Sequence, residues 1–219
     1  MKIYSLLIVP LLGLAVWASP ANAQISAVTF TGGTANGTTA AYSNYNWGYS
    51  FTANTDGIVV DDLSVYDVGG DGLAESHDVG IWQGTTLIGT VTIDAGTVDS
   101  IQDGFRYKAL STPITLIKGQ TYTVGANFAT TADKFALYCT NATYYSGITL
   151  TSYQMIGVAA SGATLTEPTN KFGGDGTQGD FGGSFIVASV PEPQTYAMVG
   201  VGLLSLLGFR KFRGQRCGA

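Results

Sequence analysis

The segment "TYTVGANF", Thr121–Phe128, alternates larger apolar side chains with small or polar ones at every second residue. A period of two places one set of side chains on each face of a β-strand. The preceding Lys118-Gly119 predicts a turn into this strand. The segment therefore indicates a strand with one face toward a core.

The same pattern recurs on both sides of this segment. In the stretch Trp47-Gly48-Tyr49-Ser50-Phe51, rings alternate with small residues. The expected strands cover residues 25–31, 47–52, 58–66, 79–82, 87–94, 105–110, 114–117, 121–128, 135–139, 148–153 and 184–188. Residues 167–183, rich in Gly and Asp, predict a long loop. Short strands separated by turns predict an all-β fold, a single antiparallel β-sandwich of the jelly-roll type.

Composition limits the function classes. Only 11% of the 219 residues are charged, against roughly 25% in an average soluble protein. Residues 24–190 contain 14 acidic and 5 basic residues, a net charge of −9. Nucleic-acid binding requires a basic face, so we expect no nucleic-acid partner.

The N-terminus predicts export. Lys2 is followed by an apolar run over residues 3–17 and by Ala21-Asn22-Ala23, which fits a cleavage site. We therefore expect residues 1–23 to be a signal peptide, with Gln24 as the first mature residue. An uncleaved membrane anchor is the alternative.

The C-terminus has three parts in residues 190–216. The turn residues Pro191, Glu192 and Pro193 precede an apolar run over residues 196–209. The basic stop consists of Arg210, Lys211, Arg213 and Arg216. A 14-residue helix reaches roughly 21 Å, short of the roughly 30 Å hydrocarbon core, and the basic residues would stay cytoplasmic. By physics alone this is a marginal membrane-anchoring helix, and a buried core helix is the alternative.

These three parts resemble the PEP-CTERM sorting signal of Gram-negative bacteria. The resemblance implies that an exosortase, a membrane-embedded cysteine protease-transpeptidase, recognises Pro191-Glu192-Pro193. It also implies that the tail is a transient membrane anchor, removed as the protein reaches the cell surface or the extracellular space.

The middle of the chain is similar to a second family. Residues 47–51, "YDVGGDGLAESHDVGIW" (residues 66–82), "DGFRYKAL" (residues 103–110) and "LIKGQTYTVGA" (residues 116–126) resemble the DUF4082 group of exported β-sandwich modules. This resemblance covers roughly residues 47–128 and implies a sandwich fold with no assigned catalysis. We expect the sandwich domain as a whole to span residues 24–189.

One loop predicts a metal site. In residues 67–78, carboxylates fall at positions 1, 5, 9 and 12, namely Asp67, Asp71, Glu75 and Asp78. Calcium takes six to eight oxygen ligands, and a glycine at position 6 permits the sharp turn. Position 3 is a glycine, which departs from the usual calcium-loop pattern. Calcium is the one cofactor that the sequence predicts, and a solvated turn between strands is the alternative.

Other candidate residues carry weaker chemistry. His77 is the only histidine, and we expect it to be a satisfied surface group, so a catalytic triad has little support. Cys139 shares its alternation with Phe135 and Leu137, which predicts a buried thiol, and Cys217 lies beyond the apolar run. Tyr144 and Tyr145 lie in a turn-rich stretch and are candidates for stacking on polysaccharide.

The sequence thus predicts a non-enzymatic, surface-sorted protein of the bacterial envelope or extracellular matrix. A carbohydrate-binding module is the alternative, favoured by a contiguous strip of exposed rings. A glycoside-acting enzyme is a third hypothesis, and two carboxylates facing each other in a cleft would favour it.

Overall fold

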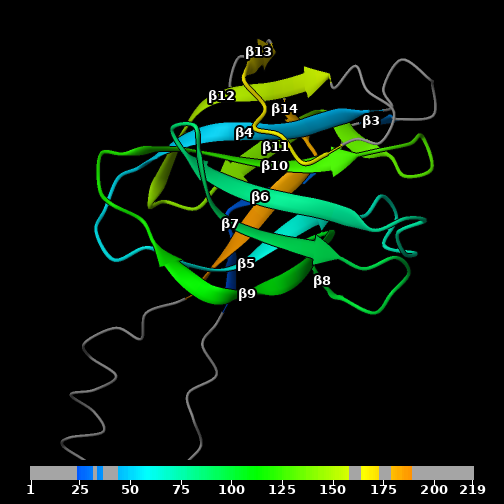
Figure 1. Ribbon diagram of the computed structural model, residues 1–219, viewed down its shortest axis with the longest axis horizontal. Helices are drawn as coiled ribbons and strands as arrows, with labels where there is room; N and C mark the ends of the chain where they lie inside the picture. Colours follow the sequence, from blue (N-terminus) through cyan, green and yellow to red (C-terminus); the bar gives the residue numbers. More distant parts are fainter. Residues whose placement is uncertain (1–23, 32–33, 37–43, 158–163, 173–178, 189–219) are drawn as a thin grey trace, which may run out of the picture.

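The computed structural model describes residues 24–31, 34–36, 44–157, 164–172 and 179–188 (Figure 1). Every regular element in these residues is a β-strand, and the strands pair antiparallel, which confirms the all-β prediction. Within the same residues, no helix has the length and apolarity needed to cross a membrane. The expected signal peptide and sorting helix lie outside the described residues.

The first sheet has five strands in the order β1-β15-β5-β9-β8. Their bounds are β1 Gln24–Ser26, β15 Gly183–Ala188, β5 Val59–Tyr66, β9 Phe105–Thr115 and β8 Ser100–Gln102. The first two residues of the strand expected at 114–117 are the end of β9, which continues through a register shift opposite Val60 and Asp62, and residues 116–117 lie beyond it. A bulge therefore joins two patterns that the sequence presents separately.

The second sheet has six strands in the order β13-β12-β4-β10-β6-β7. Their bounds are β13 Asn170–Phe172, β12 Ile148–Gly157, β4 Tyr45–Ala53, β10 Thr121–Phe128, β6 His77–Gln83 and β7 Thr86–Ile93. The predicted turn before β10 is present, and Gly119 adopts a φ of 80° there, a conformation that favours glycine.

A third, smaller sheet has the order β14-β11-β2, and β3 also pairs with β11. Its strands are β14 Gly179–Phe181, β11 Phe135–Tyr144, β2 Val28–Thr31 and β3 Thr34–Asn36. Two expectations are corrected here. The predicted strand at residues 25–31 divides at Ala27 into β1 and β2, which join different sheets. The predicted loop at residues 167–183 contains β13 and β14.

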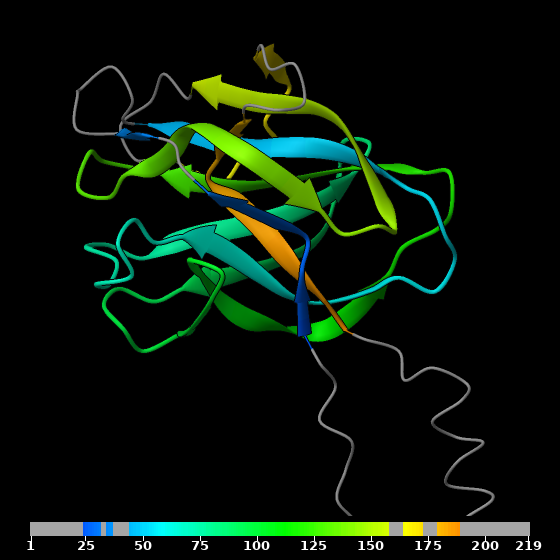
Figure 2. The same ribbon diagram turned by 180° about the vertical axis from the view of Figure 1, so that it is seen from behind.

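The sheets pack as a sandwich-like half-barrel, with β15 running diagonally across it (Figures 1 and 2). Aromatic side chains fill the interior. Phe51 lies 4.8 Å from Phe185 and 5.8 Å from Tyr122 between ring centroids, and all three rings are buried. The thiol of Cys139 is also fully buried, as its alternation predicts.

Residues 164–168, here called the strap, cross the outer face of the second sheet. Asn46 on β4 donates its amide N–H to the Thr164 carbonyl and accepts a hydrogen bond from the Thr166 backbone N–H. A Cβ atom at Gly125 would lie 2.7 Å from Pro168, so the glycine leaves the room that the strap fills. Both faces of β4 and β10 are consequently buried along most of their length, where the sequence predicted half-buried strands.

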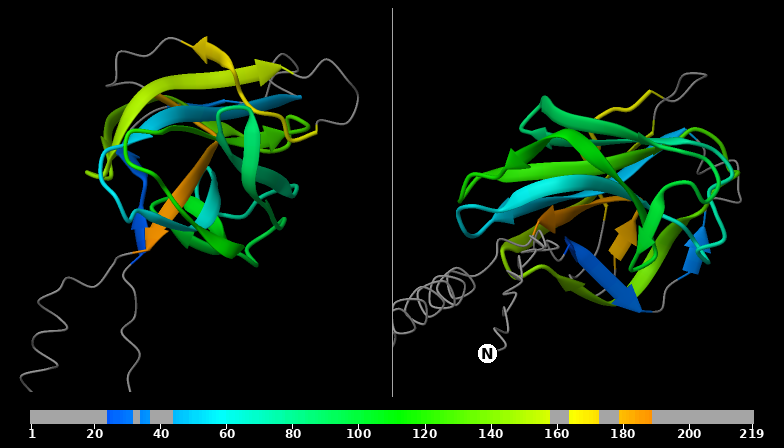
Figure 3. Two further views of the ribbon diagram at one scale, coloured as in Figure 1. Left: turned by 60° about the vertical axis from the view of Figure 1, so that its left-hand side comes forward. Right: turned by 90° about the horizontal axis from the view of Figure 1, so that it is seen from below.

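The two ends of the described domain meet at one end of the first sheet. Gln24 pairs with Ala188 across β1 and β15. On β5, Val60 lies opposite Val187, whereas Val65 lies opposite Gly183. Strand β5 therefore leads away from the point where the chain leaves the domain, and the loop that follows β5 lies at the opposite end (Figure 3).

Candidate functional site

Three loops gather at this opposite end: residues 67–76, 94–99 and 129–134, here called the loop pole. An isolated bridge between Leu73 and Gly96 joins the first two loops. The third loop joins the first because Asp133 accepts the backbone N–H groups of Ala74 and Glu75 at 2.8 and 2.9 Å. Three of the four carboxylates of the predicted calcium site, Asp67, Asp71 and Glu75, belong to the first of these loops.

Arg106 on β9 forms hydrogen bonds with both of the first two loops. Its Nε donates to Asp67 Oδ2 at 2.8 Å, and both side chains are at most 4% exposed. The other guanidinium nitrogens donate to the carbonyls of Asp99 and Gly70 at 2.9 and 3.2 Å. Asp67 Oδ2 also accepts the backbone N–H of Gly72. The charge of Asp67 is thus balanced by the buried guanidinium of Arg106, and the hydrogen bond that Asp67 accepts from Gly72 fixes the conformation of the loop.

His77 begins β6 and is buried, with its ring 4.7 Å from that of Phe128. Its Nδ1 lies 2.7 Å from the Asn127 carbonyl oxygen, and its Nε2 lies 3.0 Å from Asp133 Oδ2. The expectation of a surface histidine is therefore wrong. Strand β6 places His77 on the side toward the interior, beneath the loop of residues 129–134.

Asp133 is the centre of this second cluster, and its side chain is 11% exposed. Burial by itself raises the pKa of this carboxyl group. The hydrogen bonds from His77 and from the backbone of Ala74 and Glu75 outweigh burial and hold the pKa below its usual value. Asp133 is therefore a carboxylate at neutral pH.

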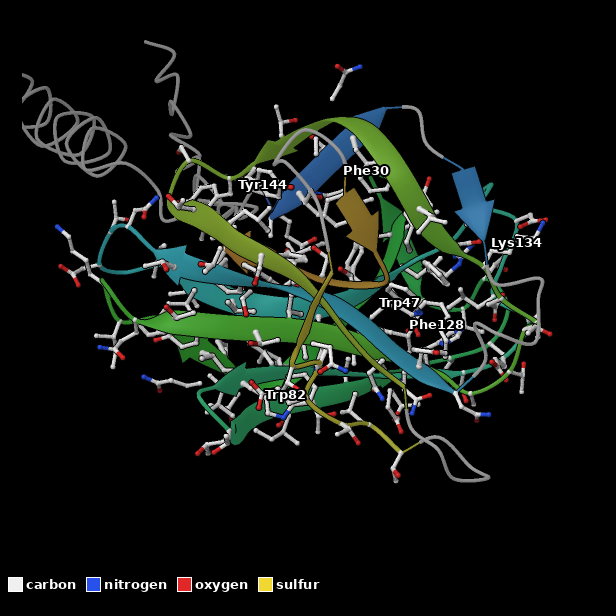
Figure 4. All side chains as sticks on the ribbon, turned by 90° about the horizontal axis from the view of Figure 1, so that it is seen from above. Phe30, Trp47, Trp82, Phe128, Lys134 and Tyr144 are labelled. Atoms are coloured by element: carbon white, nitrogen blue, oxygen red, sulfur yellow. The ribbon has the colours of Figure 1, made fainter. Side chains whose placement is uncertain are left out.

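A polar cavity of about 270 Å³ lies beside these clusters. It is lined by Asp67, Val68, Asp71, Gly72, Ala74, Ala132, Asp133 and Lys134. Figure 4 shows Lys134 toward one end of the molecule and Tyr144 displaced toward the other. The cavity has room for several water molecules beside the carboxylate of Asp133.

The structure does not bring together the four carboxylates of the predicted calcium loop. Asp67 pairs with Arg106, and Asp78 accepts a hydrogen bond from Thr92 at 2.6 Å on the exposed side of β6. Asp71 is exposed at the mouth of the cavity. Neighbouring positions along a strand point to opposite faces, which separates Asp78 from His77.

Within the part of the chain that the structure describes, one group of three potential metal ligands lies close together: Glu75, His77 and Asp133. One ligand atom from each lies within 4.8 Å of the others. Only Glu75 belongs to the predicted calcium set. Sequence reasoning missed Asp133 because it lies 56 residues from His77 and no local motif marks it.

The predicted polysaccharide residues are not exposed as expected. Tyr144 and Tyr145 are both half-buried and pack against the core. Tyr144 lies 6.4 Å from Phe181 between ring centroids. Among the described residues, the exposed large hydrophobic side chains are all aliphatic, so these residues form no strip of exposed rings.

Comparison with known families identifies one segment of the chain. Residues 189–213 match the PEP-CTERM protein-sorting motif. The C-terminus is a PEP-CTERM sorting motif. The motif implies export, processing by an exosortase and sorting to the cell surface, in agreement with the resemblance of Pro191-Glu192-Pro193 and the basic stop. It lies outside the described residues and outside the loop pole, and no curated protein sequence matches the chain.

Proposed function

We propose that this chain is a non-enzymatic β-sandwich of the bacterial envelope or extracellular matrix, displayed through its PEP-CTERM motif with the loop pole facing outward. Residues 1–23 serve as the signal peptide, residues 24–189 as the sandwich and residues 190–216 as the sorting signal. We also propose that residues 47–128 form a module of the DUF4082 type, as their sequence resemblance implies.

The pairing of Gln24 with Ala188 is the observation that supports this arrangement. Cleavage after Ala23 would leave Gln24 free to begin β1, and the sorting signal follows β15 directly. Both processing points then lie at the end of the domain nearest the membrane. The loop pole, at the other end of β5, is the part best placed to meet a partner.

The carboxylates of the loop pole support a non-enzymatic role. A general acid needs a raised pKa, whereas the pKa of Asp133 is lowered. Asp133 already accepts three hydrogen bonds, and Glu75 accepts one from the Thr130 backbone N–H at 3.2 Å. Hydrogen bonds that hold loops together therefore account for both carboxylates without a catalytic role.

Intact mass and fractionation in the native host test this proposal. The surface fraction should contain a chain that begins at Gln24 and has lost the segment beyond Pro193. Replacing Pro191, Glu192 and Pro193 together by alanine should retain the chain in the membrane fraction at its unprocessed mass. Gln194→Ala, one residue outside the turn, is the control and should be processed normally. An unprocessed C-terminus in the wild-type surface fraction would contradict the proposal.

A further inference from the structure

The cluster of Glu75, His77 and Asp133 combines one imidazole with two carboxylates from two loops. It differs from a surface patch of acids, because His77 is buried and its ring is held at both nitrogens. The orientation of the ring decides what the cluster can bind.

The Nδ1 atom of His77 faces a backbone carbonyl, which can only accept a hydrogen bond. Nδ1 must therefore carry a proton and donate it to Asn127 at 2.7 Å. The Nε2 atom of His77 faces a second acceptor, Asp133 Oδ2, at 3.0 Å, and a proton on Nε2 forms the hydrogen bond that Asp133 accepts. Both ring nitrogens therefore face oxygen acceptors, and Nε2 is the nitrogen on the side of the Asp133 carboxylate.

A metal ion can take the place of the proton between Nε2 and Oδ2. Histidines that ligate metals usually donate their other ring N–H to a carbonyl or carboxylate, which fixes the ring and its tautomer. In a tetrahedral site with bonds of about 2.0–2.2 Å, neighbouring ligand atoms lie roughly 3.3–3.6 Å apart. The 3.0 Å separation of Nε2 and Oδ2 is slightly shorter than this spacing. The three ligand atoms lie within 4.8 Å of one another, so an ion would draw them closer together.

We propose that Glu75, His77 and Asp133 form a zinc site, with a fourth position that opens toward the polar cavity. Zinc accepts imidazole nitrogen together with carboxylate oxygen, whereas calcium takes oxygen ligands. The two carboxylates balance the charge of the ion. The cavity, which Asp133 lines, supplies the space for a water molecule or a partner's ligand atom.

The site joins the loop of residues 67–76 to that of residues 129–134. An ion there fixes the loop pole in one conformation and presents a coordination position at the end of the domain remote from the sorting signal. This inference does not depend on the proposed processing, since it concerns the folded domain alone. Failure of one leaves the other intact.

Isothermal titration of zinc chloride into the purified, untagged, chelator-treated chain tests the proposal. We expect one zinc per chain and a rise in melting temperature with zinc that calcium does not reproduce. His77→Gln and Asp133→Asn should each weaken zinc binding by at least about tenfold. Glu75→Gln should do the same with the least effect on folding, because Glu75 accepts a single long hydrogen bond from Thr130.

Asp78→Asn is the matched control. Asp78 is the neighbour of His77 but bonds to Thr92 on the opposite face, so this variant should bind zinc with unchanged affinity. The proposal fails if the folded wild-type chain binds no zinc, or if folded Glu75→Gln binds as tightly as wild type. It also fails if Asp78→Asn loses as much affinity as Glu75→Gln. That result would mean that the acidic side chains of residues 67–78 bind zinc collectively, without a defined site.

Discussion

The apolar interior of the sandwich and the buried charged groups of the loop pole are held in place differently. In the interior, Phe51 packs against several rings, each of which has other neighbours. At the loop pole, Asp67 and Asp133 each accept several directional hydrogen bonds from named donors. Apolar packing distributes its energy over many weak contacts, whereas a buried charge depends on a few strong ones. The loop pole should therefore be the more sensitive to changes that preserve volume.

The largest effect is expected from cutting a ring out of the interior. Phe51→Ala leaves a cavity between Tyr122 and Phe185 and should lower the free energy of unfolding by about 3–5 kcal/mol. Urea unfolding measures this loss. Val98→Ala is the control, because Val98 is 79% exposed and its truncation should change stability by less than about 0.5 kcal/mol. Equal losses in the two variants would contradict this description of the core.

The next effect concerns a buried ion pair. Asp67→Ala leaves the guanidinium of Arg106 buried without its carboxylate and should cost about 3 kcal/mol. The double variant Asp67→Leu with Arg106→Met removes both charges and should recover a large part of that loss. Urea unfolding of wild type, Asp67→Leu, Arg106→Met and the double variant gives the coupling between the two residues. A double variant that is no more stable than Asp67→Ala would contradict this explanation. The loss in Asp67→Ala would then not come from leaving the Arg106 charge buried without a partner.

A smaller effect is expected at Asp62, a buried carboxyl group on β5 that has no ion-pair partner in the described residues. Burial, and next the nearby charge of Asp61, raise the pKa of Asp62, while the hydrogen bond from Gln24 at 2.8 Å lowers it. The folded state thus holds this proton more tightly than the unfolded state. Stability from this group is complete below the ordinary pKa of 3.8 and is lost as the pH rises through the folded-state value.

Asp62→Asn keeps an oxygen that can accept the hydrogen bond from Gln24 and removes the charge. The variant should be more stable than wild type at pH 7, and the difference should vanish as the pH falls below 3.8. Thermal unfolding across this pH range measures it. A variant that is less stable than wild type at pH 7 would mean that the ionised carboxylate itself supports the fold.

The smallest effect is expected for the exposed pair of Lys108 and Asp94. Their 2.7 Å contact raises the pKa of Lys108, chiefly through the hydrogen bond, but both side chains are well exposed. Water and salt screen such a pair. Lys108→Ala should leave the melting temperature unchanged within error, at low and at high salt. A clear loss at low salt would show that surface charges also hold the loop pole.

Local patterns were enough to predict much of the fold. Alternation located the central parts of β4, β5, β10 and β15. Side chains of a strand point to opposite faces in turn, so a period of two follows from strand geometry alone. Alternation also predicted the burial of Cys139. The short strands β13 and β14 were missed, since three residues carry too little periodicity to be distinguished from a loop.

The candidate site was predicted only in part. The sequence pointed to the loop of residues 67–78 and included Glu75, but it assigned Asp67 and Asp78 to the same ion. Ligand spacing along the chain describes a loop that wraps around a metal. It does not describe a site in which a second loop, through Asp133, supplies the central carboxylate.

The sequence by itself determined the all-β class, the alternation of the strands and the sorting motif, because each depends on residues close together in the chain. Only the tertiary structure decided that the strap buries the outer face of β4 and β10, since Asn46 and Thr164 meet across 118 residues. It also decided that His77 is buried against Asp133 and that the loop pole lies opposite the chain ends. These features arise from contacts between distant segments, and no local pattern of side chains records which segments will meet.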